Sequence, residues 1–366
     1  MTEQLSNGQP AQSRTLQLKG VNSRFLLSLL FFLLLYLLAA EAVVRWGTGR
    51  LPMGAPSLGG EHTQFEQQWF RLQEYAVQRG GVECLFLGDS TVMTDFAPGP
   101  FTEAYRQETG EVVDCFNFGV GAVTAVGFAA LSELLVQEYR PRLLLVGVQA
   151  LSFTVPEAEQ GSADLAANAW VRYKLGNFNL EGWLYEHSYL YRHLGALGQL
   201  ATFNVNPQEV MQSATGEVGG VQDGFYPMVG PGPFDVAEVP DLAVDHPYLE
   251  HYFAVMGGFQ MLPENLAALE RIMALDSPAT QVIVVEMPVP ETFYAFFANG
   301  SRDYEAFVAE VAGETAVNHI PFWRITDPSQ LPASLWFNYN HLTADGAPIF
   351  SRWLGETMAK WMENRD

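Results

Sequence analysis

The chain has 366 residues, of which 48% are hydrophobic and 16% are charged. This composition supplies a full hydrophobic core and excludes a mainly disordered chain, and the length corresponds to roughly two domains or one large domain with an insertion. With 19 basic and 41 acidic residues the net charge is −22, which repels phosphate backbones and argues against a nucleic-acid partner.

An apolar segment near the N-terminus is the first predicted element. Residues 25–40 carry no charge, and Arg24 and Arg45 flank a longer stretch that ends at Trp46. The charge-free part is slightly short for a membrane span, but arginine side chains near the ends reach the headgroup region and tryptophan favours the interface. We therefore predict a transmembrane anchor over residues 24–46.

The charges before this segment predict its orientation. Residues 1–23 are polar and are predicted to form a disordered tail, and basic residues outnumber acidic ones up to the anchor. That bias favours a cytoplasmic N-terminus and an extracytoplasmic body. A cleaved signal peptide is the alternative, because Ala40-Glu41-Ala42 is similar to a cleavage site, although the apolar run exceeds the usual signal core.

Strands and helices alternate in the rest of the chain. A Gly/Pro-rich linker and a lead-in helix are predicted over residues 47–78. Continuous apolar runs predict strands at Val82–Leu87, Val112–Phe116, Leu143–Val148 and Gln281–Glu286, with a fifth within His319–Ile325. Helical patterns follow at Gly127–Tyr139, Pro263–Leu275, Ser301–Asn318 and Ala344–Asn364. This alternation predicts a parallel sheet covered on both faces, with the chemistry at the carboxyl ends of its strands.

One long segment interrupts that alternation. Residues 153–262 contain clustered aromatic residues and then a loop rich in Gly and Pro. We interpret them as a cap inserted into a core domain that spans residues 79–362. The aromatic residues would either form the insertion's own core or stack on sugar rings.

The first predicted strand ends in Gly88-Asp89-Ser90, where a helix is expected to begin. A strand–turn–helix junction presents a hydroxyl at the edge of the sheet beside backbone N–H groups, which suits a nucleophilic serine. Asp and Ser are also frequent helix caps, so an ordinary capped turn is the alternative. Near the C-terminus, His341 stands just before the last helix, where it can act as a general base.

Together, Gly88-Asp89-Ser90 and His341-Leu342 resemble the first and last sequence blocks of the SGNH/GDSL hydrolase superfamily. The resemblance covers residues 80–360 apart from the insertion. It implies a flavodoxin-like three-layer α/β/α sandwich with a parallel sheet, with Ser90 as nucleophile and His341 as general base. Members are esterases, lipases, carbohydrate deacetylases and O-acyltransferases, and this chemistry requires neither cofactor nor metal.

The remaining blocks of the family match less closely. Asn117-Phe118-Gly119-Val120-Gly121-Ala122 resembles the second block, so the N–H of Gly121, or alternatively of Gly119, is expected to join that of Ser90 in an oxyanion hole. Gln149 stands where the family usually has an asparagine, and its longer side chain is a candidate to donate an amide N–H to the same oxyanion.

The last block departs in a way that affects the mechanism. Asn338 stands where the family usually has an aspartate, three residues before His341. A neutral asparagine can orient the imidazole but cannot stabilise its cation, so Asp327 or a backbone carbonyl is considered as a further partner. The departure also leaves open a non-catalytic relative. Asp89 is a further candidate, from the first block.

The whole layout resembles one subgroup of the family more than it resembles free esterases. A single anchor, an exported domain and a large insertion are similar to the membrane-anchored proteins of cell-surface O-acylation, such as the alginate acetylation proteins and the D-alanyl transfer protein. The resemblance implies an acyl donor, a glycan or lipid-linked acceptor and a polytopic membrane-bound O-acyltransferase as partners. The alternative is a catalytically weak or inactive accessory protein that binds polysaccharide.

Only two cysteines are present, Cys84 and Cys115, and each lies on one of two predicted neighbouring strands. We expect them to be buried free thiols, because parallel neighbours rarely have suitable disulfide geometry. A disulfide is the alternative, because the body is predicted to lie outside the cytoplasm. No Cys/His spacing typical of a zinc site occurs.

Overall fold

The computed structural model describes residues 23–47, 56–60, 62–154, 162–203, 223–233, 235–241 and 249–364. It divides into two units, Met1–Met53 and Gly54–Asp366. The first contains helix α1 (Ser23–Gly47), which is long and apolar enough to cross a membrane. Apart from Ser23, the tail predicted over residues 1–23 lies outside the described residues.

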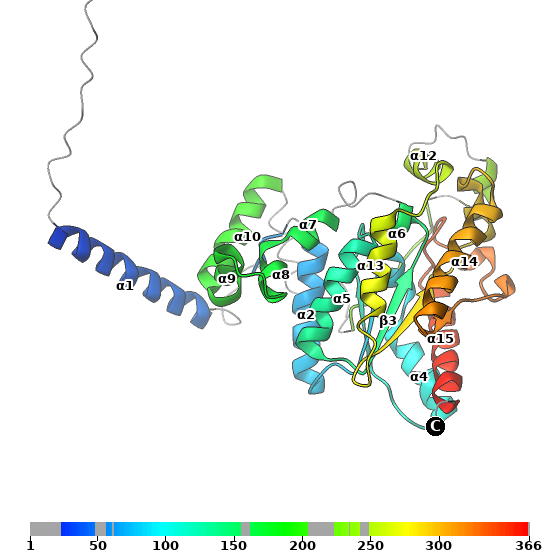
Figure 1. Cartoon of the computed structure of the whole chain (residues 1–366), viewed down its shortest axis with the longest axis horizontal. Helices are drawn as coiled ribbons and strands as arrows, with labels where there is room; N and C mark the ends of the chain where they lie inside the picture. The colour runs from blue at the N-terminus through cyan, green and yellow to red at the C-terminus, as the bar shows by residue number, and fades with distance from the viewer. Residues whose placement is uncertain are drawn as a thin grey trace, which may run out of the picture. The chain divides into compact units, whose positions relative to one another are not determined.

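The second unit, the body, is built on a five-stranded parallel sheet (Figure 1). Its strands are β1 (Cys84–Gly88), β2 (Cys115–Gly119), β3 (Leu143–Val148), β4 (Gln281–Glu286) and β5 (Phe322–Trp323), in the order β2-β1-β3-β4-β5. This is the flavodoxin-like order, in which the carboxyl ends of β1 and β3 flank the point where the winding reverses. The predicted fold class is therefore confirmed.

The second strand begins and ends later than its apolar run predicted. It contains Asn117, which reads as a turn residue in the sequence. The Asn117 side chain is buried and donates to the carbonyls of Val92 and Phe96 at 2.7 Å each. Because tertiary partners satisfy its amide, a polar residue is accommodated inside a buried strand.

Side chains of each strand alternate between two hydrophobic cores, one on each face of the sheet. Leu85 and Leu87 belong to one core, and Cys84 and Phe86 belong to the other. The first core is covered by α2 (Thr63–Arg79), α5 (Ala125–Tyr139), α13 (Pro263–Met273) and α14 (Ser301–Val317). The second is covered by α3 (Ser90–Asp95), α4 (Pro98–Thr109) and α15 (Gly346–Glu363), of which α4 and α15 lie side by side in Figure 1. The body is thus a three-layer sandwich.

The inserted segment forms two structural parts. Short helices α6 (Leu151–Thr154) and α12 (Glu250–Gly257) and the 3-10 helix η2 (Val236–Asp241) lie near the sheet edge, where Tyr252 contacts Tyr339 with ring centroids 4.4 Å apart. Helices α7 (Ser162–Ala167), α8 (Ala169–Lys174), α9 (Leu180–His187) and α10 (Tyr189–Phe203) form what we call the lateral subdomain. Trp170 anchors it on α2, with its ring 4.8 Å from that of Trp69. This part therefore extends the helical layer beside the sheet (Figure 1).

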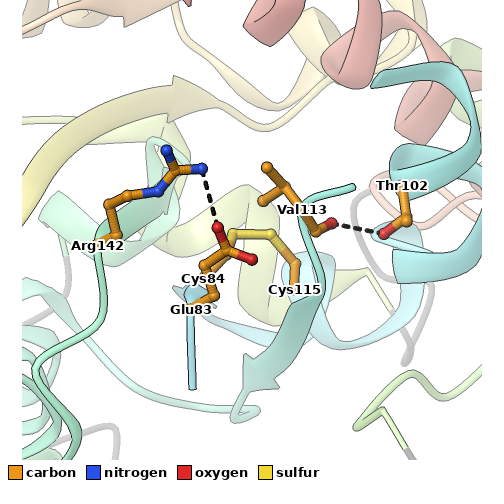
Figure 2. The surroundings of a disulfide bond; sticks show 6 residues. All are labelled: Glu83, Cys84, Thr102, Val113, Cys115 and Arg142. Carbon is orange, nitrogen blue, oxygen red and sulfur yellow. Dashed lines mark hydrogen bonds and ion pairs between the residues drawn. A yellow bond between two sulfur atoms is a disulfide. The ribbon is translucent and has the colours of Figure 1, made fainter. Parts of the chain in front are cut away.

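The two cysteines form a disulfide, so the prediction of free thiols was wrong. Cys84 and Cys115 are direct partners in the register of β1 and β2, with Cα atoms 4.3 Å apart (Figure 2). Both side chains also point into the same core, because residues in register on parallel strands face the same side of the sheet. The pairing places the bond at the amino ends of the two strands, at the edge opposite the carboxyl ends where Ser90 follows β1.

Candidate active site

Ser90 is the first residue of α3, directly after β1. Asp89 caps this helix, because its Oδ1 accepts from the N–H of Thr91 at 2.8 Å. Its Oδ2 accepts from the Ser152 hydroxyl at 2.8 Å, which ties the segment after β3 to the segment after β1. Burial raises the pKa of Asp89. Asp89 therefore positions the turn that presents Ser90, and its two oxygens are both engaged in doing so.

His341 lies on the loop that precedes α15. Its Nε2 is 2.9 Å from Ser90 Oγ, although 251 residues separate the two. The backbone N–H of the next residue, Leu342, donates to Asp95 Oδ1 at 2.9 Å, which fixes the loop to the end of α3. The structure thus brings the serine and the histidine of the predicted pair into direct hydrogen-bond contact.

Asn338 determines which nitrogen of the imidazole carries the proton. Its Oδ1 accepts from the backbone N–H of His341 at 2.9 Å and of Asn340 at 3.0 Å, and it lies 3.1 Å from His341 Nδ1. Backbone N–H groups only donate, so the amide oxygen and not the NH₂ group must face them. Nδ1 therefore faces an acceptor and carries the proton, which leaves the lone pair of Nε2 directed at Ser90.

This arrangement changes what the replacement of aspartate by asparagine costs. In a serine protease, replacing the aspartate of the catalytic triad by asparagine is damaging because the asparagine stabilises the wrong tautomer of the histidine. Here two backbone donors hold the Asn338 amide in the orientation that keeps the right tautomer. What is lost is the negative charge, and burial lowers the pKa of His341 to about 4. The imidazole is neutral at physiological pH and is a weak base.

Two N–H groups near the pair have no hydrogen-bond acceptor among the described residues. Gln149 is buried, and no acceptor among the described residues is hydrogen-bonded to its Nε2. Its Oε1 lies 3.5 Å from Asn340 Nδ2, a long contact that places the side chain beside the histidine loop. Within the described part of the chain, the Ser90 N–H also has no hydrogen-bond acceptor. Both groups are suited to hold an oxyanion.

The two glycine candidates are not equivalent. The Gly119 N–H donates to Asn117 Oδ1 at 2.8 Å inside the strand and is not available to a ligand. Gly121 lies close to the nucleophile, because a Cβ built on it would be 3.6 Å from Ser90 Cβ. Its N–H donates to the exposed side chain of Gln64, with Oε1 at 3.0 Å. The Gly121 N–H, which was expected to bind the substrate oxygen, is thus hydrogen-bonded to the side-chain oxygen of Gln64.

Gln64 is a residue near the site that the sequence did not single out, and Ala122 was noted only as the last residue of the second block. Gln64 lies in the first turn of α2, and the neighbouring His62 Nε2 is 2.9 Å from the Gly121 carbonyl. Ala122 has φ = 56°, a backbone conformation uncommon for a residue with a Cβ and frequent at functional turns. Only the glycine-rich run before Ala122 hinted at such a turn, and nothing local predicted the contact with α2.

Other candidates lie elsewhere. Asp327 is exposed and caps the 3-10 helix η4 (Pro328–Gln330) through the Ser329 N–H at 3.0 Å, so it does not serve His341. Among the described residues, no group of three or more His, Cys, Asp or Glu side chains is placed to hold a metal ion. A cavity of about 510 Å³ beside β4 and β5 is lined by Glu286, Arg324 and Trp336, among others, and not by the Ser90–His341 pair.

Comparisons with known proteins give structural likeness only. No family model and no curated protein matches the sequence. A gut microbial diltiazem-metabolizing enzyme matches with 12% identity and a TM-score of 0.36, over 76% of this chain and 47% of that enzyme. The present chain thus spans about half of the length of that enzyme. An inhibitor-bound aryl esterase of M. smegmatis matches with 13% identity and a TM-score of 0.32, covering 78% of this chain and 99% of its own. A proposed arylesterase of Agrobacterium tumefaciens C58 matches with 10% identity and a TM-score of 0.29, covering 77% and 99%. The fold assignment rests on the strand order of this chain itself.

Proposed function

We propose that the chain is a serine-dependent acyl-transferring enzyme that forms an acyl-serine on Ser90. The observation that carries this proposal is the chain of contacts from Ser90 Oγ to His341 Nε2 at 2.9 Å and from His341 Nδ1 to Asn338 Oδ1 at 3.1 Å. A nucleophile, a base and a group that orients the base are the three parts that nucleophilic catalysis needs. An accessory protein that had lost the chemistry would have no need to keep this alignment.

The proposed reaction has two halves that use the same groups. Ser90 Oγ attacks the donor carbonyl while its proton passes to His341 Nε2, and the carbonyl oxygen becomes an oxyanion near the Ser90 N–H and Gln149 Nε2. The oxyanion collapses, the leaving group takes the proton from Nε2, and an acyl-serine remains. An acceptor hydroxyl then gives its proton to Nε2 and attacks the ester, and Ser90 regains its proton as the acyl group leaves.

We further propose that the acceptor is a glycan or lipid-linked hydroxyl outside the cytoplasm and that α1 is a single-pass anchor. The apolar length of α1 and the basic residues that precede it support this location. A polytopic membrane-bound O-acyltransferase is the proposed source of acyl groups. Hydrolysis is the same reaction with water as the acceptor, so the partition between water and a sugar hydroxyl decides between an esterase and a transferase.

The proposal is tested on the full chain in detergent with a fluorophosphonate probe, which forms a covalent bond only with an activated serine. Labelling is expected in the wild type and is expected to be lost in Ser90→Ala and strongly reduced in His341→Ala. A well-folded protein that remains unlabelled, or labelling that survives Ser90→Ala, would refute the proposed nucleophile. Addition of an oligosaccharide to an aryl acetate assay then measures how much acyl group reaches sugar instead of water.

A further inference from the structure

The lateral subdomain carries an unusual exposed surface. Outside α1, the exposed large hydrophobic residues elsewhere in the described chain are single valines: Val77, Val112, Val229 and Val317. The lateral subdomain carries all the others, which include two aromatic residues: Phe178, Leu180, Trp183 and Leu194. Phe178 is 75% exposed and Leu180 is 65% exposed, so their side chains contribute little to the core.

The aromatic members form one continuous edge. The ring of Phe178 lies 6.3 Å from that of Tyr173, which lies 6.0 Å from the ring of His187. Trp183 continues the series at 5.2 Å from His187. Leu180 stands one turn before Trp183 on α9, so it presents the same side of that helix. We call Tyr173, Phe178, Leu180, Trp183 and His187 the aromatic edge.

The charge of this region differs from that of the whole chain. Residues 162–203 contain equal numbers of basic and acidic residues: Arg172, Lys174 and Arg192 against Asp164, Glu181 and Glu186. The whole chain has a net charge of −22. A strongly acidic protein is repelled by an anionic lipid surface, so a neutral region is the part of it that approaches a membrane with the least electrostatic penalty.

The polypeptide enters the body at this same subdomain. Residues 48–55 separate α1 from Pro56 in the sequence, and the Ser57 N–H donates to the carbonyl of Arg192 in α10 at 3.1 Å. Glu66 of α2 fixes the segment from its other side, since its Oε1 accepts from the Leu58 N–H at 2.7 Å. A chain that leaves a membrane at the end of α1 is therefore attached first to the lateral subdomain.

We propose that the aromatic edge is a membrane-contacting surface that rests in the headgroup region of the bilayer. Exposed Trp and Phe side chains beside the half-buried Tyr173, in a region of balanced charge, have the composition that favours this interface, where an apolar ring is buried and a polar tip stays hydrated. The inference rests on the proposed anchoring by α1 and is independent of the chemistry of Ser90. Its consequence is that the body has a fixed face toward the lipid instead of rotating freely on its linker.

Single labelled cysteines test this in the full chain, because Cys84 and Cys115 are engaged in a disulfide. The environment-sensitive dye NBD is attached to Leu180→Cys, to Val317→Cys as an exposed control outside the subdomain, and to Leu34→Cys within α1. Each protein is reconstituted in phosphatidylcholine vesicles with and without brominated acyl chains. We expect blue-shifted emission and at least twofold quenching by bromolipid at positions 34 and 180, with no quenching at position 317.

The outcomes separate the two proposals. Quenching at 34 but not at 180 would overturn the membrane-contacting edge and leave the anchor standing, whereas no quenching at 34 would overturn both. A blue shift at 180 without bromolipid quenching would mean that the edge is covered by protein, such as a second copy of the chain, and would also overturn the proposal. Adding Phe178→Ser and Trp183→Ser to the Leu180→Cys protein should abolish most of the quenching at 180, because both side chains are exposed and their loss leaves the core intact.

Discussion

Replacing Asn338 by Asp is expected to accelerate the proposed acylation of Ser90, because the geometry that an aspartate needs is already present. A carboxylate oxygen at this position would accept the same three N–H groups as the amide oxygen does now. A unit charge at the 3.1 Å that separates Oδ1 from His341 Nδ1 attracts the imidazolium by about 5 kcal/mol at an effective dielectric constant of about 20. Desolvation of the new carboxylate reduces the net gain to about 2–3 kcal/mol.

This gain corresponds to a rise of about two units in the pKa of His341, from about 4 to about 6. The base is active only when deprotonated, so the acid limb of the rate profile should move from about pH 4 in the wild type to about pH 6 in Asn338→Asp. At pH 7.5 both proteins have a neutral imidazole, and the better-stabilised cation of the variant should speed acylation about 10- to 100-fold. That is less than the roughly 10⁴-fold effect known where the tautomer is also wrong.

The assay is the second-order rate of fluorophosphonate labelling and of aryl acetate hydrolysis from pH 4 to pH 9. Asn338→Leu is the control, because it keeps the approximate volume and removes the acceptor; it should lose at least about 100-fold in rate at every pH. If Asn338→Asp shows an unmoved acid limb and no gain in rate, Asn338 does not hold Nδ1 and the tautomer argument is wrong.

Three further variants test other parts of the structure. Gln64→Met removes the acceptor that holds the Gly121 N–H and should speed labelling about two- to tenfold. Gln67→Met in the same helix is the control and should leave the labelling rate unchanged. Slower labelling of Gln64→Met would mean that Gln64 supports the loop around Gly121. Replacing Cys84 and Cys115 by Ala should lower the free energy of unfolding by about 3–4 kcal/mol in denaturant titrations, and an unchanged midpoint would contradict this. Burial raises the pKa of Asp95 in the folded protein. Above about pH 4 the unfolded chain loses this proton more readily than the folded protein does, so the free energy of unfolding falls as the pH rises. Asp95→Asn should therefore gain stability relative to the wild type from about pH 4 to pH 8.

The sequence predicted the bounds of two strands correctly from their apolar runs. Leu143–Val148 and Gln281–Glu286 have the predicted bounds. The second strand lies further along the chain than predicted, because it includes Asn117. The side-chain amide of Asn117 donates to carbonyls of another segment, which no local pattern reveals. The disulfide was missed for a related reason, since general geometry disfavours it, and only the register of β1 and β2 places Cys84 opposite Cys115.

The site shows the same division between local and tertiary information. Ser90 was predicted at the junction of a strand and a helix, and His341 just before the last helix. Their resemblance to the first and last blocks of one hydrolase superfamily linked the two residues. The roles of Asn338 and Gln64 depend on contacts that arise only in the folded chain. Asn338 looked like a defect in the sequence, yet two backbone N–H groups fix its amide. Gln64 lies in the helix that the sequence predicted only as a segment preceding the sheet, with no expected contact to Gly121.

In the proposed reaction, the low pKa of His341 also limits which acyl donors suit the site. A neutral imidazole whose conjugate acid has a pKa of about 4 is a weak base for the serine hydroxyl, but once protonated it gives its proton readily to a leaving group. Acylation must then depend strongly on the donor's own reactivity, so thioesters and aryl esters should react far faster than alkyl esters. In the second half, a weak base favours an acceptor held in position over free water, because positioning replaces part of the missing activation.

This argument predicts the leaving-group dependence. Across a series of substituted phenyl and alkyl acetates, the wild type should show a steep fall in kcat/KM as the pKa of the leaving group rises. Asn338→Asp should flatten that slope, because a stronger base makes the nucleophile less dependent on an activated donor. Equal slopes in the two proteins would mean that His341 is not the group that limits acylation, and the preference for activated donors would then have to come from the oxyanion donors around Gln149.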